Sequence, residues 1–253
     1  MKIVILTGAG ISAESGLQTF RAEDGLWEGH RVEDVATPEA FERSPRTVTR
    51  FYNARRLAAA EALPNAAHSA LARLEEDGRH EVVLITQNVD DLHERAGSQD
   101  VIHMHGSLAM ARCYECNVQF DAPMEMVVGD RCPGCGAPTT RPDIVWFGEM
   151  PYRMEEISDA LATADLFVSI GTSGNVYPAA GFVEFAAQAG ASTLELNLEP
   201  SSGAFEVSRQ GPATVLVPVS FVEGGVPAGS LSGEALSHPR PTGVPEYQPV
   251  VQL

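Results

Sequence analysis

The chain has 253 residues, which is enough for one large domain or for one domain that carries a smaller insertion. Charged residues make up 20% and hydrophobic residues 44%, as in a globular protein, and 17 basic against 34 acidic side chains give a net charge of −17. Nucleic acid is therefore not an expected partner, because its phosphates would be repelled. No run approaches the roughly 20 apolar residues of a membrane span, and a glycine-rich segment from residue 8 leaves no room for a signal peptide. We expect a cytoplasmic protein with no membrane partner.

Predicted strands and helices alternate along the chain. Apolar runs predict strands at residues 2–7, 82–86, 166–170, 193–197 and 214–219. Ser44-Pro45 predicts the start of a helix that ends near Leu63, before Pro64, and Asn65 is expected to cap a second helix ending near Gly78. Strands that alternate with helices predict an α/β fold with a parallel, doubly wound sheet.

A glycine-rich loop follows the first predicted strand. Gly8-Ala9-Gly10-Ile11-Ser12-Ala13 fits the G-x-G-x-x-G/A pattern of dinucleotide-binding loops. The alternative is a tight turn that needs glycine for a positive φ. A hydride-transferring domain would continue with a strand that ends in an acid about 20 residues further on. Residues 22–44 show no strand pattern, so an ordinary dehydrogenase fits poorly.

Polar side chains follow two other predicted strands. Gln87, Asn88 and Asp90 come after the strand at 82–86, at the edge of the sheet where open α/β proteins bind ligands. An amide and a carboxylate together suit a carboxamide ligand, which both donates and accepts hydrogen bonds. His103 and His105 follow a short apolar run, and one of them is a candidate general base, with a structural role as the alternative.

The four cysteines form two pairs, Cys113-x2-Cys116 and Cys132-x2-Cys135. In a reducing compartment this spacing favours a tetrahedral zinc site over two disulfides. Four thiolates close the coordination shell, so the zinc is expected to be structural. The segment 109–140 should form a small zinc module. Residues 225–253, rich in Gly, Pro and Ser, read as a tail.

Together these segments resemble the sirtuin family of NAD-dependent protein-lysine deacylases. GAGISAESGLQTFR, TQNVDDLHERAG, HMHGSL, the paired cysteines, RPDIVWFGE, GTSGNVYPAAG and NLEP match family segments in the same order, from about Lys2 to Phe221. Gln18 departs from the Pro or Arg that the family often has there. The resemblance implies a discontinuous Rossmann-like NAD-binding domain (1–30, 68–108 and 141–224), a helical insertion (31–67) and the zinc module (109–140).

The resemblance also implies a role for each matching residue. NAD would be bound by the loop residues Gly8, Ala9, Gly10, Ala13, Phe20 and Arg21, and by Gln87, Asn88, Asp90, Gly171, Thr172, Ser173, Asn197, Glu199 and Ala213. The substrate peptide would add as a strand between the stretch 145–149, with Val145, Phe147, Gly148 and Glu149, and the stretch after Gly174. In the implied reaction the acyl oxygen attacks the ribose carbon that bears nicotinamide. His105 then acts as the base for the ribose hydroxyls, with Asn88 and Asp90 as the other catalytic residues, and His103 is structural.

The helix after Ser44 carries an arginine on an otherwise apolar face, formed with Val48, Phe51 and Tyr52. Burial of Arg55 is costly unless an anion meets it. An ion pair with Glu33 or Asp34, or extension of the side chain into solvent, is the alternative. Tyr52-x-x-Arg55 resembles the signature of sirtuins that remove succinyl and malonyl groups, and the small Ala36 agrees with it. The expected substrates are proteins with succinylated, malonylated or acetylated lysines, and the expected state is a monomer.

Two other functions are compatible with the same motifs. A mono-ADP-ribosyltransferase would use the same cleavage of NAD, and an NAD-sensing or zinc-bearing interaction module would use no catalysis. Asn88, Asp90 and His105 together argue against a mere binder, which needs no base. A zinc ribbon that binds nucleic acid is disfavoured by the net charge of −17.

Overall fold

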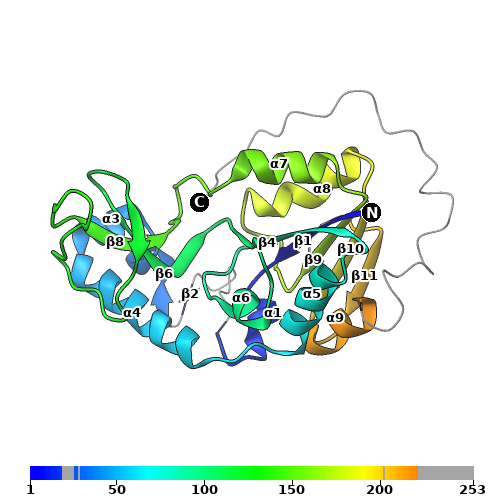
Figure 1. Cartoon of the computed structure of the whole chain (residues 1–253), viewed down its shortest axis with the longest axis horizontal. Helices are drawn as coiled ribbons and strands as arrows, with labels where there is room; N and C mark the ends of the chain where they lie inside the picture. The colour runs from blue at the N-terminus through cyan, green and yellow to red at the C-terminus, as the bar shows by residue number, and fades with distance from the viewer. Residues whose placement is uncertain (19–25, 28, 202, 222–253) are drawn as a thin grey trace.

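The computed structural model describes residues 1–18, 26–27, 29–201 and 203–221 (Figure 1). The expected tail 225–253 and two expected NAD-binding residues, Phe20 and Arg21, lie outside the described residues.

A six-stranded parallel sheet forms the larger part of the molecule. Its order is β11-β10-β9-β1-β4-β5, and every neighbouring pair is parallel. The strands are β1 (Lys2–Thr7), β4 (Glu81–Thr86), β5 (Ile102–His103), β9 (Leu166–Ile170), β10 (Ser192–Asn197) and β11 (Val207–Gln210). The predicted α/β fold with a parallel, doubly wound sheet is confirmed.

Helices cover both faces of this sheet (Figure 1). Alternate residues of β1 point to opposite faces, so that Ile3 and Ile5 enter one core while Val4 and Leu6 enter the other. The first core contains α5 (Ala66–Glu76) and α9 (Ala213–Phe221), and the second contains α7 (Met154–Ala162) and α8 (Phe182–Gln188). Three short helices, α1 (Gly10–Ala13), α6 (Leu92–Ala96) and η1 (Ala179–Gly181), lie in the connections.

A smaller region lies beside the sheet, at the left of Figure 1. It contains the helices α2 (Val32–Val35), α3 (Pro38–Arg43) and α4 (Pro45–Glu61) and an antiparallel sheet of order β7-β6-β8. The strands of that sheet are β6 (Gly106–Cys113), β7 (Gln119–Asp121) and β8 (Thr140–Ile144). Its own core joins α4 to β6 and β8 through Tyr52, Leu108 and Ile144.

The helix predictions around Pro64 agree with the structure. The helix α4 begins at Pro45 and ends at Glu61, two residues before the expected Leu63. Asn65 caps α5 as expected, because its side chain accepts hydrogen bonds from the backbone of Ala67 and His68.

The predicted strand at 214–219 is wrong: these residues belong to α9. A short, wholly apolar run does not distinguish a buried strand from a buried helix. The edge of the sheet is taken by β11 instead. In α9, Val217 and Phe221 are buried while Val215 and Val219 are exposed, which is a helical spacing. The carboxylate of Glu14 accepts hydrogen bonds from the backbone N–H and the hydroxyl of Thr214, and so caps the first turn.

The segment 22–44, where no strand was expected, contains the two-residue strands β2 (Leu26–Trp27) and β3 (His30–Arg31). They pair only with each other, so the main sheet gains no strand there.

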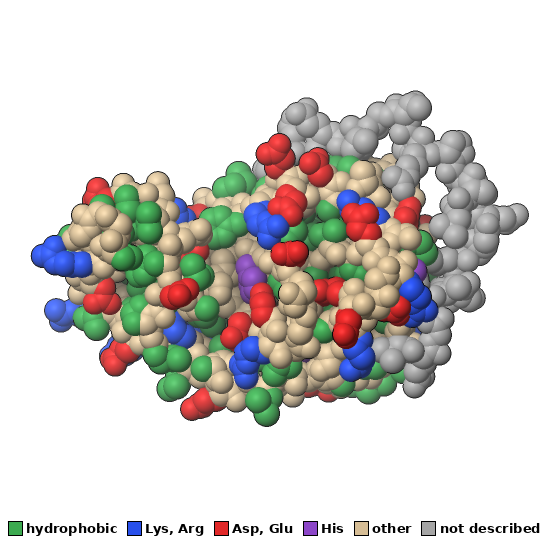
Figure 2. Space-filling model, in the orientation of Figure 1, with side chains coloured by type: hydrophobic (Ala, Val, Ile, Leu, Met, Phe, Trp, Pro, Cys, Tyr) green, Lys and Arg blue, Asp and Glu red, His purple; other side chains and the backbone are tan. Residues whose placement is uncertain are grey.

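No helix among the described residues has the length and apolar character needed to span a bilayer. On the face drawn in Figure 2, acidic and basic side chains are interspersed over the described residues, without a continuous basic patch.

Candidate functional site

The order of the sheet places a crevice beside β1. The chain runs from β1 outward to β4 and β5, then returns to β9 on the other side of β1. The connections after β1 and β9 therefore diverge, and open α/β sheets bind ligands at such a switch point.

Three glycines allow the loops after β1 and β9 to approach each other closely. A Cβ atom on Gly8 would lie 2.8 Å from the carbonyl oxygen of Gly171, and one on Gly10 would lie 2.7 Å from the Gly171 Cα. Gly171 has a φ of +62°, and its own Cβ would lie 2.5 Å from the Ile11 nitrogen. The backbone of Gly10 donates to the Gly171 carbonyl at 2.8 Å. Side chains at these positions would separate the loops, so the glycines are required by close approach and not only by a turn.

A cavity of about 1120 Å³ opens at this edge and continues toward α4 and β8. It is larger than the roughly 300–1,000 Å³ of a common small-molecule site, which leaves room for a dinucleotide and an acyl chain. Every NAD-binding and substrate-binding residue expected from the sequence, apart from Phe20 and Arg21, lines it: Gly8, Ala9, Gly10, Ala13, Ala36, Tyr52, Arg55, Gln87, Asn88, Asp90, His105, Val145, Phe147, Gly148, Glu149, Gly171, Thr172, Ser173, Asn197, Glu199 and Ala213.

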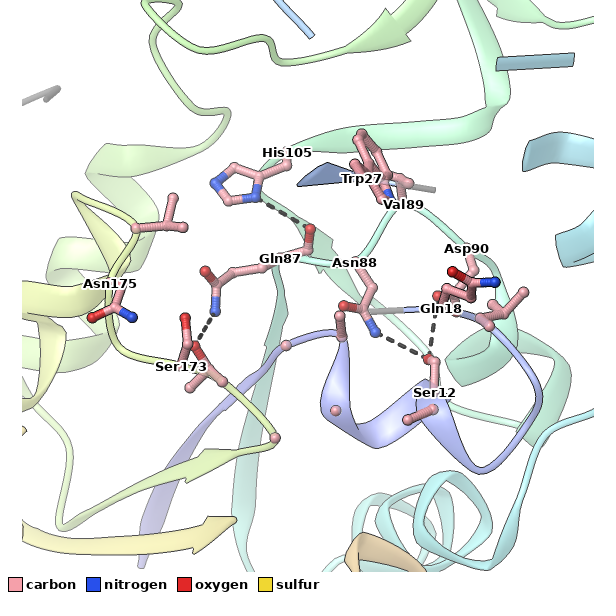
Figure 3. Close-up of a pocket in the computed structure, with 18 of the residues that line it drawn as sticks. Ser12, Gln18, Trp27, Gln87, Asn88, Val89, Asp90, His105, Ser173 and Asn175 are labelled. Atoms are coloured by element: carbon pink, nitrogen blue, oxygen red, sulfur yellow. Dashed lines mark hydrogen bonds between the residues drawn. The ribbon is translucent and has the colours of Figure 1, made fainter. Parts of the chain in front are cut away.

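Ser12 connects the glycine loop to the polar segment after β4 (Figure 3). Its hydroxyl accepts a hydrogen bond from Asn88 Nδ2 at 3.0 Å and donates to Asp90 Oδ2 at 3.2 Å. The other oxygen of Asp90 accepts from the Leu92 N–H at 3.2 Å. Burial raises the pKa of Asp90 above its ordinary value, and the hydrogen bonds from Leu92 and Ser12 oppose that shift. Ser12 was not identified as a site residue from the sequence, because its partners lie 76 and 78 residues away.

The two histidines at the end of β5, His103 within the strand and His105 after it, differ in their hydrogen bonds. His105 lines the cavity, and its Nδ1 lies 3.2 Å from the Gln87 carbonyl oxygen (Figure 3). A carbonyl can only accept, so Nδ1 carries the proton and Nε2 of the neutral ring is the basic atom. Burial lowers the pKa of His105 to about 4, against the opposing effect of the Gln87 carbonyl.

His103 has partners at both ring nitrogens. Nδ1 lies 3.1 Å from the Asn88 carbonyl oxygen and Nε2 lies 2.7 Å from Glu94 Oε1. Burial alone would lower the pKa of His103, but Glu94 and the Asn88 carbonyl raise it. With both nitrogens bonded, His103 holds the loop that carries Asn88.

At the far end of the cavity, Tyr52 and Arg55 lie one turn apart on α4 and are 0% and 7% exposed. The Arg55 guanidinium lies 5.5 Å from the centre of the Trp27 ring, a cation–π contact. Glu33 forms an ion pair with Arg31, and Asp34 forms one with Arg43. At 7% exposed, Arg55 is buried in the cavity wall and does not extend into solvent.

Part of the segment expected to bind the peptide already forms hydrogen bonds within the protein. The backbone N–H groups of Val145 and Phe147 donate to the carbonyls of His105 and Ala36. Oε2 of Glu149 accepts from the Trp146 N–H and from Arg141 Nη2, both at 2.8 Å. The Glu149 carboxylate thus supports the segment, and the N–H groups of Val145 and Phe147 are already bonded within the protein.

The four cysteines converge at the zinc module. Their Sγ atoms all lie within 4.8 Å of one another, with Cys113 and Cys135 at 3.7 Å and Cys116 and Cys132 at 3.5 Å. Four thiolates about 2.3 Å from one zinc ion would be about 3.8 Å apart, so the set fits a tetrahedral Zn²⁺. Within the described part of the chain, no other group of three or more His, Cys, Asp or Glu side chains has such an arrangement.

The fold and these sites define a class: an α/β protein with a dinucleotide-type glycine loop, a neutral histidine on the same cavity and a four-cysteine metal module. The model of the Sir2 family matches residues 8–178, and the chain belongs to this family. A protein of Vibrio parahaemolyticus named NAD-dependent protein deacylase is 60% identical over 221 residues, which cover 85% of this chain and 92% of that protein. An Escherichia coli protein of the same name is 54% identical over 239 residues, 91% of this chain and 85% of its own length.

Solved structures agree. A complex of a Sir2 homologue with NAD has a TM-score of 0.78 and 42% identity, covering 85% of this chain and 86% of that one. A complex of Sir2 with a p53 peptide and NAD⁺ has a TM-score of 0.74 and 30% identity, covering 86% and 91%.

Proposed function

We propose that this protein is an NAD-dependent deacylase of protein lysines, producing nicotinamide and O-acyl-ADP-ribose. The observation that carries the proposal is the single cavity in which the glycine loop, Asn88, Asp90 and His105 meet. The family and the names of the relatives support the same activity. We assign NAD binding to the domain formed by 1–30, 68–108 and 141–224, and we take 31–67 as a helical insertion beside the zinc module 109–140.

The residues at the switch point suit NAD. Gly8, Gly10 and Gly171 would leave room for the pyrophosphate, since a Cβ at any of them meets backbone of the facing loop. Asn197 and Glu199 would bind the adenosine ribose near Ala213, and Asn88 with Asp90 would hold the carboxamide of nicotinamide. When bound, NAD supplies a glycosidic bond that breaks as the acyl oxygen of the substrate attacks.

His105 would remove the proton from a ribose hydroxyl. Its Nδ1 proton is held by the Gln87 carbonyl, which leaves Nε2 to accept that proton. Gln87 is itself held by a hydrogen bond from its Nε2 to Thr172 Oγ1 at 3.1 Å. The base is therefore tied to the loops after both β4 and β9.

For the acyl group, we propose succinyl and malonyl, with acetyl also accepted. Tyr52 and Arg55 line the same cavity and can both donate to one carboxylate, with the guanidinium donating two bonds. Ala36 lines the same cavity, where a larger side chain would take space from a longer acyl chain.

The test is incubation with NAD and matched succinyl-, malonyl- and acetyl-lysine peptides, with mass spectrometry of peptide and nucleotide products. We expect free lysine, nicotinamide and O-acyl-ADP-ribose in equal amounts. ADP-ribose attached to protein or peptide, with the acyl group retained, would instead identify a mono-ADP-ribosyltransferase.

A further inference from the structure

We propose that Trp146 is a positioning residue that directs the proton of the Tyr52 hydroxyl away from the indole, so that the hydroxyl donates to the acyl group and favours acyl groups that end in a carboxylate. The inference rests on the proposed removal of acidic acyl groups and adds the residue that sets the polarity of the acyl site.

The hydrogen bond between the two side chains has one possible direction. Nε1 of Trp146 lies 3.0 Å from the Tyr52 hydroxyl oxygen. An indole N–H donates and never accepts, whereas a phenol does both. The Tyr52 oxygen must therefore be the acceptor, and its own proton points away from Trp146. Among the described residues this is the one hydrogen bond found for the hydroxyl, and Tyr52 lines the cavity.

The indole is held so that it cannot turn away from Tyr52. Trp146 is 1% exposed, and its ring lies 4.0 Å from the Arg141 guanidinium. The backbone N–H of Trp146 and Nη2 of Arg141 both donate to Oε2 of Glu149 at 2.8 Å. The ion pair of the buried Arg141 with the partly exposed Glu149 thus fixes the backbone and the ring of Trp146 together. Trp146 and Tyr52 lie on segments 94 residues apart, so this bond also joins α4 to the segment after β8.

A hydroxyl oriented in this way distinguishes between groups of the same shape. In the proposed site the Tyr52 O–H and the Arg55 guanidinium would both donate to the end of the acyl group, and a carboxylate accepts at both oxygens. A terminal carboxamide has one accepting oxygen and an amino group that only donates. Its amino group would therefore face either the Tyr52 O–H or the Arg55 guanidinium, which are donors as well. A free tyrosine hydroxyl would rotate to accept from that amino group. Trp146 prevents this rotation, because it occupies the accepting side of the oxygen.

The experiment compares W146F, Y52F and the double variant with wild type, at saturating NAD. The peptides carry succinyl-lysine, its carboxamide isostere or acetyl-lysine. W146F keeps an aromatic ring and removes the N–H. We expect it to lower the ratio of kcat/KM for succinyl over carboxamide peptide by about three- to tenfold, the usual range for one neutral hydrogen bond. The loss should appear in KM for the succinyl peptide, and the succinyl-to-acetyl ratio should fall with it.

Y52F provides the matched background. If Trp146 acts through the Tyr52 hydroxyl, adding W146F to Y52F should change neither the succinyl-to-carboxamide ratio nor the succinyl-to-acetyl ratio of kcat/KM any further. Equal losses on all three peptides, or the same change in both backgrounds, would show that Trp146 only packs the pocket and would overturn the inference. The proposed function is judged separately: if Y52F lowers desuccinylation, it stands even where Trp146 fails. Absence of desuccinylation by the wild type would overturn both. Melting temperature and zinc content of each variant identify any that fails to fold.

Discussion

His103 is the last residue of β5 and His105 lies two residues further along the chain, yet their ring nitrogens have different partners. His103 bonds Glu94 and the Asn88 carbonyl, while His105 bonds only the Gln87 carbonyl through Nδ1. The sequence alone could place both histidines at the sheet edge. It could assign the base only by resemblance, because the distinction depends on carbonyls 15 and 18 residues away.

Replacement of His105 by Ala is expected to reduce kcat by about 10²–10⁴, the usual contribution of a general base. NAD affinity should stay within a few-fold, because the proposed role follows binding. Single-turnover kinetics and calorimetric NAD titration measure the two quantities. His103→Gln is the control, and it should cost less than His105→Ala. Near wild-type turnover by His105→Ala would remove His105 from the mechanism.

The pH profile should reflect the buried environment of His105. A general base works when it is neutral, so activity is lost as the pH falls through its pKa. Burial lowers the pKa of His105 from 6.5 to about 4. The acid limb of kcat/KM for the peptide, which reports the free enzyme, should therefore have its midpoint below 6.5. A midpoint at or above 6.5 would contradict a desolvated His105 as the essential base.

At the scale of elements, strands inside the sheet were the most predictable. Leu166–Ile170 and Lys2–Thr7 are buried on both faces by helices and appear as continuous apolar runs. The run at 214–219 has the same apolar character but forms a helix. The strand β11, with alternating burial over only four residues, gave no comparable signal. The run at 214–219 packs against α5 as the helix α9, and β11 forms the edge of the sheet. This outcome depends on tertiary packing, which the local sequence pattern does not show.

Contacts between elements were less predictable than the elements. Ser12 lies inside the glycine loop that the sequence identified, but its bonds to Asn88 and Asp90 are visible only when β1 and β4 pair. Trp146 lies in the stretch 145–149 that was expected to bind the peptide, but its hydrogen bond to Tyr52 was not predicted. Its partner Tyr52 lies in a helix of the other region.

The zinc module is an element whose stability should depend on metal. Its four cysteines lie at the end of β6 and in the connections between β6, β7 and β8, and binding of zinc to thiolates is coupled to folding. Cys113→Ala is expected to lose zinc, lower the melting temperature and expose 109–140 to proteolysis, with activity lost indirectly. Val127→Ala, at an exposed position of the same module, should retain zinc and stability. Full zinc occupancy and unaltered melting in Cys113→Ala would contradict a structural metal site.

At the scale of the whole molecule, the cavity belongs to both regions. The sheet edge supplies the glycine loops, Asn88 and Asp90, while α4 supplies Tyr52 and Arg55. In the proposed function, the sheet would bind the dinucleotide and the helical region would add selection of the acyl group. The two parts are also joined by Arg95 of α6, which donates to the carbonyls of Ala59 and Ala62 at the end of α4.

The central claim is that one cavity cleaves NAD and selects an acidic acyl group, and the most direct test is the selectivity of Arg55→Met. The measurement is the ratio of kcat/KM for succinyl- and acetyl-lysine peptides of one sequence, at saturating NAD. A charge-assisted hydrogen bond contributes about 1.5–3 kcal/mol, so the substitution should lower this ratio by about ten- to a hundredfold. Loss of both activities by the same factor, or a wild type that prefers acetyl, would contradict the assignment of Arg55 to the acyl carboxylate.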